Sequence, residues 1–253
     1  MNIKTLSIVL TVLLAATGWA PSALALDMEK VSRSPVDVRL CNFREGKTMN
    51  DLDKFTAKFR EYANKNNAEY SAWTLTPQYE TDIGYDVIWM GAWPSAESFG
   101  TSIEQWNAEG GQIAGLFQEA VECGGHMMYA SAPINAAKST PEDGVWMAWQ
   151  CTLNDGVSMA DAYAAHLNAG QAMKAMGALG LSWFFQPMIG AGNTDYDYTH
   201  VVAFYRYSDL GATMEMFLNN KGQAEQQKIL SKVSSCRAPN LFDALSVRAY
   251  DER

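Results

Sequence analysis

The chain has 253 residues, of which 48% are hydrophobic and 19% charged, and its formal net charge at pH 7 is −9. An acidic chain without a basic tract binds nucleic acid and anionic lipid poorly, so we expect no nucleic-acid partner. The length suits one large domain or two small ones.

The first 25 residues have the pattern of a secretory signal peptide. Lys4 precedes an apolar stretch from about Leu6 to Trp19, and small residues follow at Ala23 and Ala25. A positive start, a short apolar run and an A-x-A site predict cleavage after Ala25. The apolar run is too short and too rich in Ala and Gly to span a bilayer. We therefore expect a secreted or periplasmic protein with no membrane partner after the signal is removed.

The remaining chain contains two similar halves. An offset of 110 residues aligns Cys41 with Cys151 and Trp73 with Trp183. The same offset aligns four further identical pairs, Gly46/Gly156, Met49/Met159, Asp51/Asp161 and Pro77/Pro187. Cys and Trp are uncommon residues, so chance explains these matches poorly. We predict one unit at 35–133, a linker at 134–143 and a second unit at 144–250.

Periodicity defines the elements of the first unit. Residues 36–43 alternate apolar and polar side chains and predict a strand, and Thr48 with Asp51 predicts the start of a helix. One face of this helix carries Met49, Leu52, Phe55, Phe59 and Tyr62. Residues 69–77 and 85–93 predict the second and third strands. A second helical region opens at Ser95, and residues 126–132 predict a fourth strand.

The second unit repeats this order. Residues 145–153 predict its first strand, and Ser158 with Asp161 predicts the start of its first helix. Residues 181–187 and 198–207 predict two more strands, a second helical region opens at Ser208 or Asp209, and residues 241–250 predict the last strand. Each unit therefore has the order β-α-β-β-α-β, the ferredoxin-like motif.

The four cysteines predict two disulfides, because an exported protein with an even number of cysteines normally pairs them. Four cysteines allow three pairings, and the order of the elements selects one. The first cysteine of each unit lies near the end of the first strand, and the second lies where the last helix gives way to the last strand. These places meet at one edge of the sheet, so we expect Cys41–Cys123 and Cys151–Cys236.

Two such units in one chain resemble the dimeric α/β-barrel superfamily, in which two ferredoxin-like units place their sheets face to face. Its members include antibiotic-biosynthesis-type monooxygenases, EthD-like and stress-responsive barrel proteins, heme-degrading monooxygenases and chlorite-dismutase-like heme proteins. The resemblance rests on element order and duplication, and it implies an α+β fold with an intramolecular, pseudo-dimeric α/β barrel. The fold alone does not fix a function, because it carries catalysts and plain binders alike.

Three histidines are the first candidates for chemistry. His200 opens a predicted strand, with Phe204 and Arg206 on the same side by period two. His166 lies on the first helix of the second unit, where Thr56 stands in the first unit. A residue needed only for folding tends to survive in both copies, so this asymmetry favours function. We predict His200 as a catalytic base or orienting residue, and His166, Phe204 and Arg206 as ligand-binding residues.

Heme and copper are the two cofactors considered, and neither is favoured over an unidentified ligand. The resemblance suggests heme, with His200 or His166 as the axial ligand and Arg206 as a further contact. The run HMM at 126–128 suggests copper, because His126 and Met128 share one side of a strand and thioether sulfur suits Cu(I). The pair Met214 and Met216 offers similar ligands.

Tryptophan is abundant in the predicted strands. Trp73 and Trp183 occupy equivalent strand positions and face either the barrel interior or the helices. A barrel between two facing sheets can enclose an apolar cavity of ligand size, so we predict both as ligand-binding residues.

Three functional hypotheses follow. The first is an exported protein that binds an apolar or aromatic small molecule and acts as a binder or as a cofactor-independent, monooxygenase-like enzyme. The second is a periplasmic heme or copper protein. The third is a non-catalytic structural or interaction protein whose barrel is filled with side chains. The sequence leaves the oligomeric state open.

Overall fold

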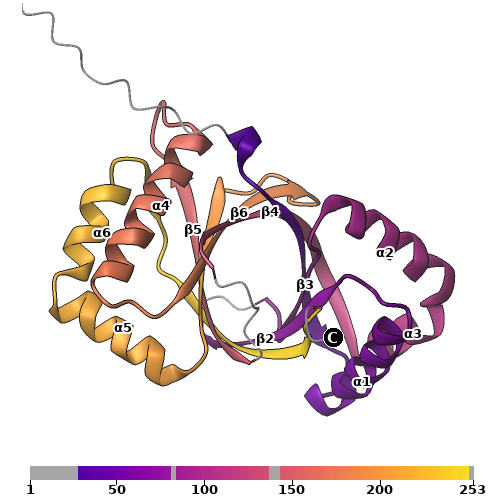
Figure 1. The fold of residues 1–253 in the computed structure, drawn as a ribbon. Helices are drawn as coiled ribbons and strands as arrows, with labels where there is room; N and C mark the ends of the chain where they lie inside the picture. Colours follow the sequence, from indigo (N-terminus) through magenta and orange to yellow (C-terminus); the bar gives the residue numbers. More distant parts are fainter. Residues whose placement is uncertain (1–27, 81–83, 137–142, 251–253) are drawn as a thin grey trace, which may run out of the picture.

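The structure is a computed structural model that describes residues 28–80, 84–136 and 143–250. A ring of strands forms a barrel at the centre, and two groups of helices lie outside it on opposite sides (Figure 1). The predicted signal peptide, residues 1–25, lies outside the described residues, as do residues 137–142 of the predicted linker. Among the described residues, no helix combines the length and the apolar composition needed to cross a bilayer.

The first ferredoxin-like unit begins, after a short 3-10 helix at Met28–Lys30, with strand β1 (Ser34–Phe43) and helix α1 (Met49–Lys65). Strands β2 (Ser71–Tyr79) and β3 (Val87–Ala92) follow. The second helical region consists of two helices, α2 (Ala96–Glu109) and α3 (Gly111–Ala120), and strand β4 (Val121–Asn135) closes the unit. The break at Gly110 suits glycine, since a Cβ there would press on the Trp106 ring.

The second unit has the same element order. It runs through β5 (Gly144–Leu153), α4 (Met159–Ala175), β6 (Leu181–Ile189) and β7 (Tyr198–Phe204). Helices α5 (Tyr207–Asn219) and α6 (Gly222–Leu230) form its second helical region. A short strand, β8 (Ser234–Cys236), pairs with β5, and β9 (Asn240–Arg248) completes the unit. Helices α1, α2 and α3 cover the first unit, and α4, α5 and α6 cover the second (Figure 1).

All strand pairs in the barrel are antiparallel. The sheet order is β7-β6-β4-β1-β3-β2-β9-β5-β8, and an additional pairing of β7 with β5 closes the ring. Within the ring, β4-β1-β3-β2 belong to the first unit and β9-β5-β7-β6 to the second. The units meet at two seams, β2 with β9 and β4 with β6. The predicted fold class is confirmed: two tandem ferredoxin-like units form an intramolecular α/β barrel.

Matching capping boxes begin the first helix of each unit. The Thr48 backbone N–H donates to Asp51 Oδ2 at 3.2 Å, and the Ser158 N–H donates to Asp161 Oδ2 at 3.1 Å. Each carboxylate therefore satisfies a backbone donor at the positive end of a helix. Hydrogen bonds from Lys54 and then Thr48 lower the pKa of Asp51, and hydrogen bonds from Ser158 lower that of Asp161. These residues serve the fold.

Two disulfides join Cys41 to Cys123 and Cys151 to Cys236, which are the pairs expected from the element order. Cys41 lies opposite Cys123 in the ladder between β1 and β4, and Cys151 lies opposite Cys236 in the ladder between β5 and β8. Both Cys41 and Cys151 are fully buried. Each bridge therefore fastens the first strand of a unit to the segment that follows its last helix.

Apolar side chains cluster inside the barrel. Trp73 from β2, Trp146 from β5 and Trp183 from β6 belong to one apolar cluster there. The Trp146 and Trp183 rings are stacked at 5.8 Å with an interplanar angle of 2°, and Trp73 lies 6.0 Å from Trp146. The other buried members of this cluster come from the seven strands of the ring other than β5: Val36, Leu75, Ile88, Met90, Tyr129, Phe185, Val201, Ala203, Phe242 and Ala244. The stacked pair belongs to the second unit, and the tilted contact between Trp73 and Trp146 joins the two units inside the barrel.

Candidate functional site

Two cavities lie outside the barrel, each between one unit's sheet and its own helices. The first-unit pocket lies under α1, α2 and α3 and has a volume of about 370 Å³. The second-unit pocket lies under α4, α5 and α6 and has a volume of about 320 Å³. Both volumes fall at the lower end of the range of small-molecule sites, which is roughly 300–1,000 Å³.

Two neighbouring histidines distinguish the second-unit pocket. His166 projects from α4 and is 1% exposed, whereas His200 projects from β7 and is partly buried. Their ring centroids are 4.5 Å apart. His166 Nε2 makes a hydrogen bond of 3.0 Å with the Tyr198 hydroxyl, which is 2.6 Å from Ser234 Oγ. These buried hydrogen bonds fix the orientation of the His166 ring, and the fixed ring packs against His200.

Both imidazoles are neutral at pH 7. Burial lowers the pKa of His166 to about 4. Burial, together with the neighbouring His166, lowers the pKa of His200 well below its ordinary value. Burial disfavours the charged form because the low dielectric of the interior solvates the imidazolium poorly. A neutral imidazole keeps one nitrogen lone pair free for a proton, a donor group or a metal.

His200 keeps this lone pair available. Neither of its ring nitrogens makes a hydrogen bond to any part of the chain that the structure describes. Its ring stacks on Trp149 at 5.3 Å with an interplanar angle of 27°, which fixes its orientation. The result is an oriented, uncharged and unpaired imidazole on the wall of a cavity.

The rest of the second-unit pocket is largely apolar and rich in methionine. Its polar groups are few, and Lys174 at the edge is the basic one among the described lining residues. Methionine side chains are flexible and adapt to the shape of a ligand. The apolar walls are formed by Ile134, Met147, Trp149, Met173, Val202, Phe204, Leu210, Met214, Met216 and Phe217.

The structure brings together three of the residues singled out in the sequence, since His166, His200 and Phe204 all line the second-unit pocket. Arg206 is elsewhere: it precedes α5, is exposed and pairs with Asp209 at 2.8 Å. Trp73 and Trp183 lie inside the barrel and line neither pocket. A ligand role for these three residues stays a prediction.

A copper role for His126 and Met128 stays a prediction. His126 Nε2 lies 3.1 Å from Asp37 Oδ2, and Met128 stands opposite Asp37 in the ladder between β1 and β4. Within residues 28–80, 84–136 and 143–250, no three His, Cys, Asp or Glu side chains are grouped to hold a metal ion. Met214 and Met216 both line the second-unit pocket.

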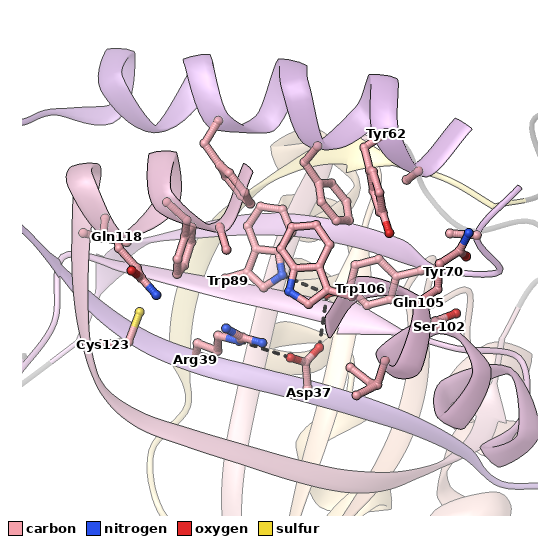
Figure 2. Close-up of a pocket in the computed structure, with 18 of the residues that line it drawn as sticks. Asp37, Arg39, Tyr62, Tyr70, Trp89, Ser102, Gln105, Trp106, Gln118 and Cys123 are labelled. Atoms are coloured by element: carbon pink, nitrogen blue, oxygen red, sulfur yellow. Dashed lines mark hydrogen bonds and ion pairs between the residues drawn. The ribbon is translucent and has the colours of Figure 1, made fainter. Parts of the chain in front are cut away.

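The sequence interpretation missed the first-unit pocket, which Figure 2 shows. One signal pointed to it. Asp37 and Arg39 put two charged side chains on one face of an alternating strand, and in the structure Asp37 is 2% exposed. A buried carboxylate needs partners, so its strand neighbours were candidates for a polar site.

Comparisons with known proteins identify relatives by shape alone. No protein-family model matches the chain, and no curated protein is detectably similar in sequence. The chlorite-dismutase-like protein TA0507 matches with a TM-score of 0.50 at 12% identity, over 85% of this chain and 96% of that one. A variant of chlorite dismutase from Candidatus Nitrospira defluvii in complex with cyanide also gives 0.50, at 8% identity, over 86% and 92%. At such identities the likeness establishes the shared fold.

Proposed function

We propose that this chain binds a small apolar or aromatic molecule in the second-unit pocket. The observation that carries the proposal is the neutral, unpaired imidazole of His200 on the wall of an apolar cavity. Such a side chain contributes little to the stability of the fold, because its burial costs desolvation free energy that no hydrogen bond offsets. A ligand that supplies the missing partner explains why it is there.

The pocket suggests the chemistry of this ligand. Trp149 and Phe204 offer aromatic surface for a flat ring, and the methionines adapt to its outline. His200 then accepts a hydrogen bond from a donor on the ligand or binds a metal that the ligand carries. With about 320 Å³ of space, the ligand is compact unless the methionines move.

Heme is the second candidate, and the same imidazole favours it. A neutral histidine is the usual axial ligand of heme iron, and the apolar walls suit the macrocycle once the methionines move to enlarge the cavity of about 320 Å³. His200 would ligate the iron, His166 would back it, and Lys174 at the pocket edge would pair with a propionate. Bound heme would supply redox and oxygen chemistry. The shared fold with chlorite dismutases adds to the case for testing heme first.

Monooxygenase-like catalysis without a cofactor extends the first candidate. His200 is the residue to accept a proton from the bound molecule, since its lowered pKa keeps it unprotonated at neutral pH. Oxygen consumption in the presence of an identified ligand tests this activity, and His200→Gln should abolish it.

The test of the binding proposal is a titration of the folded protein with hemin and, separately, with a neutral apolar fluorophore. We expect saturable 1:1 binding of at least one of them, with a shifted Soret band if the iron is ligated. His200→Leu should remove the Soret shift and weaken binding at least tenfold, and His126→Leu serves as the matched control. Equal binding by the His200→Leu and His126→Leu variants would contradict the proposal.

We also propose that the protein works outside the cytoplasm. Two features support this: the signal-like pattern of residues 1–25 and the two disulfides, which persist in oxidising compartments. Recovery of the protein from the periplasm or medium with Leu26 as its first residue is the expected result. Recovery of the full-length chain from the cytoplasm would contradict it.

A further inference from the structure

The first-unit pocket is walled by aromatic rings. Phe55, Phe59 and Tyr62 reach it from α1, Trp106 from α2, and Trp89 and Trp93 from β3 and the residue after it. Neighbouring rings meet edge to face: Phe55 and Trp89 are 5.2 Å apart, and Tyr62 and Trp106 are 5.3 Å apart. The cavity of about 370 Å³ lies among these rings, above the outer face of the sheet (Figure 2). Such walls favour a flat aromatic ligand.

The floor of the pocket is a polar network. The Tyr70 hydroxyl donates to Asp37 Oδ1 at 3.2 Å and accepts from Trp89 Nε1 at 2.8 Å. Arg39 Nε lies 3.4 Å from Asp37 Oδ2 (Figure 2). Burial next to Asp37 raises the pKa of Tyr70 well above its ordinary value, so Tyr70 remains a donor. Gly91 makes room for this arrangement, because a Cβ there would collide with the Tyr70 ring.

The network leaves Arg39 with donors to spare. Its Nε faces Asp37, and its two Nη groups make no hydrogen bond within the described part of the chain. The side chain is 33% exposed and borders the cavity beneath Trp89 (Figure 2). The Asp37 carboxylate already interacts with Arg39, Tyr70 and His126. The two Nη groups of Arg39 are therefore charged hydrogen-bond donors that remain available to a ligand. A guanidinium in this state binds a carboxylate in a forked geometry.

Two more donors at the pocket have no acceptor. Trp93 is 4% exposed, and its Nε1–H is buried without a hydrogen bond in the described residues. The Tyr62 hydroxyl, which lies near Asn66, is likewise buried without a partner at hydrogen-bond geometry. Figure 2 shows this hydroxyl pointing from α1 toward the sheet, beside Trp106. Indole N–H can only donate, so a group that satisfies Trp93 must be an acceptor.

These observations agree on one class of ligand. Arg39 lies opposite Trp89 in the ladder between β1 and β3, whereas Trp93 follows the far end of β3. The guanidinium and the unpaired indole N–H are therefore separate donor groups contributed by different strand positions around the pocket. A positively charged ligand would meet Arg39 unfavourably, and an oxygen-free hydrocarbon would leave three donors unpaired.

We propose that the first-unit pocket binds a planar aromatic carboxylate that carries a second oxygen acceptor at its far end. The carboxylate pairs with the Nη groups of Arg39, the ring lies between the aromatic walls, and the second oxygen accepts from Trp93 and Tyr62. This site is separate from the second-unit pocket and does not depend on the function proposed for it.

A series of naphthalene probes tests the proposal on the complete mature protein. The probes are 6-hydroxy-2-naphthoate, 2-naphthoate and 2-naphthylmethylammonium, followed by probe fluorescence and by calorimetry. We expect saturable 1:1 binding of 6-hydroxy-2-naphthoate, about tenfold weaker binding of 2-naphthoate, and no saturable binding of the ammonium probe. Saturation by the ammonium probe at similar concentrations, or by none of the three probes, would overturn the proposal.

Variants then locate the site. Arg39→Met should weaken binding of both carboxylates at least tenfold, and Trp93→Phe should make the two carboxylates bind alike. Arg237→Met is the matched control, because Arg237 is an exposed arginine of the second unit. Far-UV circular dichroism verifies that each variant is folded. If Arg39→Met leaves the affinity unchanged while His200→Leu removes binding, the probe occupies the second-unit pocket and the proposal is wrong.

Discussion

His200 occupies in the second unit the ladder position that Trp89 occupies in the first. Trp89 lies opposite Arg39, which stands two residues before Cys41 on β1. His200 lies opposite Trp149, which stands two residues before Cys151 on β5. In the first unit the indole donates to Tyr70 and has its partner. In the second unit the His200 imidazole has no hydrogen-bond partner among the residues that the structure describes. The same ladder position thus carries an indole N–H that is already hydrogen-bonded in the first unit and an imidazole nitrogen that can accept a hydrogen bond in the second. The two pockets therefore suit different ligands.

Truncation of the two histidines of the second-unit pocket should affect stability differently. His166 is fully buried and hydrogen-bonded to Tyr198, so His166→Ala should lower the free energy of unfolding by about 2–4 kcal/mol. His200 borders a cavity and makes no hydrogen bond, so His200→Ala should cost about 1 kcal/mol and leave the thermal midpoint nearly unchanged. Denaturant unfolding measures both. A larger loss for His200→Ala would mark His200 as a core residue.

Acidification should destabilise the protein through His166. Its pKa is about 4 in the folded state, below the value of 6.5 expected when unfolded, so the unfolded chain binds protons first. The stability contribution is complete above about pH 6.5 and is lost as the pH falls toward 4. The loss amounts to about 3 kcal/mol.

The measurement compares denaturant unfolding at pH 7.5 and pH 4.5 for the unaltered chain and for His166→Met. The variant cannot titrate at this position, so its stability should fall by clearly less over the same interval. His200 contributes in the same direction, since its pKa is also lowered. An identical acid dependence in both proteins would argue against a neutral His166.

Removal of either disulfide should have nearly the same effect. The bridged cysteines are 82 residues apart in the first unit and 85 in the second. In the chain-entropy account, each loop stabilises the fold by about 4 kcal/mol. We expect losses of this order, equal within about 1 kcal/mol, for Cys41→Ala with Cys123→Ala and for Cys151→Ala with Cys236→Ala. Calorimetric or denaturant unfolding of both double variants provides the check, and a negligible loss in either would refute the expectation.

Trp73 should prove to be a core residue. It is 2% exposed inside the barrel, next to Trp146. Trp73→Ala should cost about 3–5 kcal/mol, because it leaves a cavity in a packed interior. The folded fraction of the variant should bind ligands of the second-unit pocket with unchanged affinity. If affinity falls while stability does not, the ligand role predicted for Trp73 is correct.

The fold could be predicted because its signals are local. Alternation of side chains marked the strands, and capping residues such as Asp51 and Asp161 marked the helix starts. Cysteine positions then agreed with the element order. Helix breaks were harder to predict: α5 and α6 separate at Lys221, a non-glycine residue with a φ of 68°, although the turn-favouring Asn220 and Gly222 stand on either side of it.

The site was harder to predict because it depends on which face of each strand points into the barrel and which points toward the helices. Period two placed His200 and Phe204 on one side, and both do line one pocket. The same argument added Arg206, but β7 ends at Phe204 and the chain turns there into α5. The first-unit pocket assembles Asp37, Tyr70 and Trp93 from separate strands and loops, and only the register of the ladders brings them together.

Each of the eight barrel strands has a neighbour on both sides within the same chain. Exposed strand edges are where sheets of different molecules join, and this ring offers none along its circumference. A single unit made alone would present both outer edges of its four-stranded sheet, at β2 and β4 or at β9 and β6. Such a half-molecule would be prone to self-association. In the linked chain, the edge strands of one unit pair with those of the other unit instead. Because the two units are parts of one chain, their sequences can differ, whereas the subunits of a symmetric homodimer are identical.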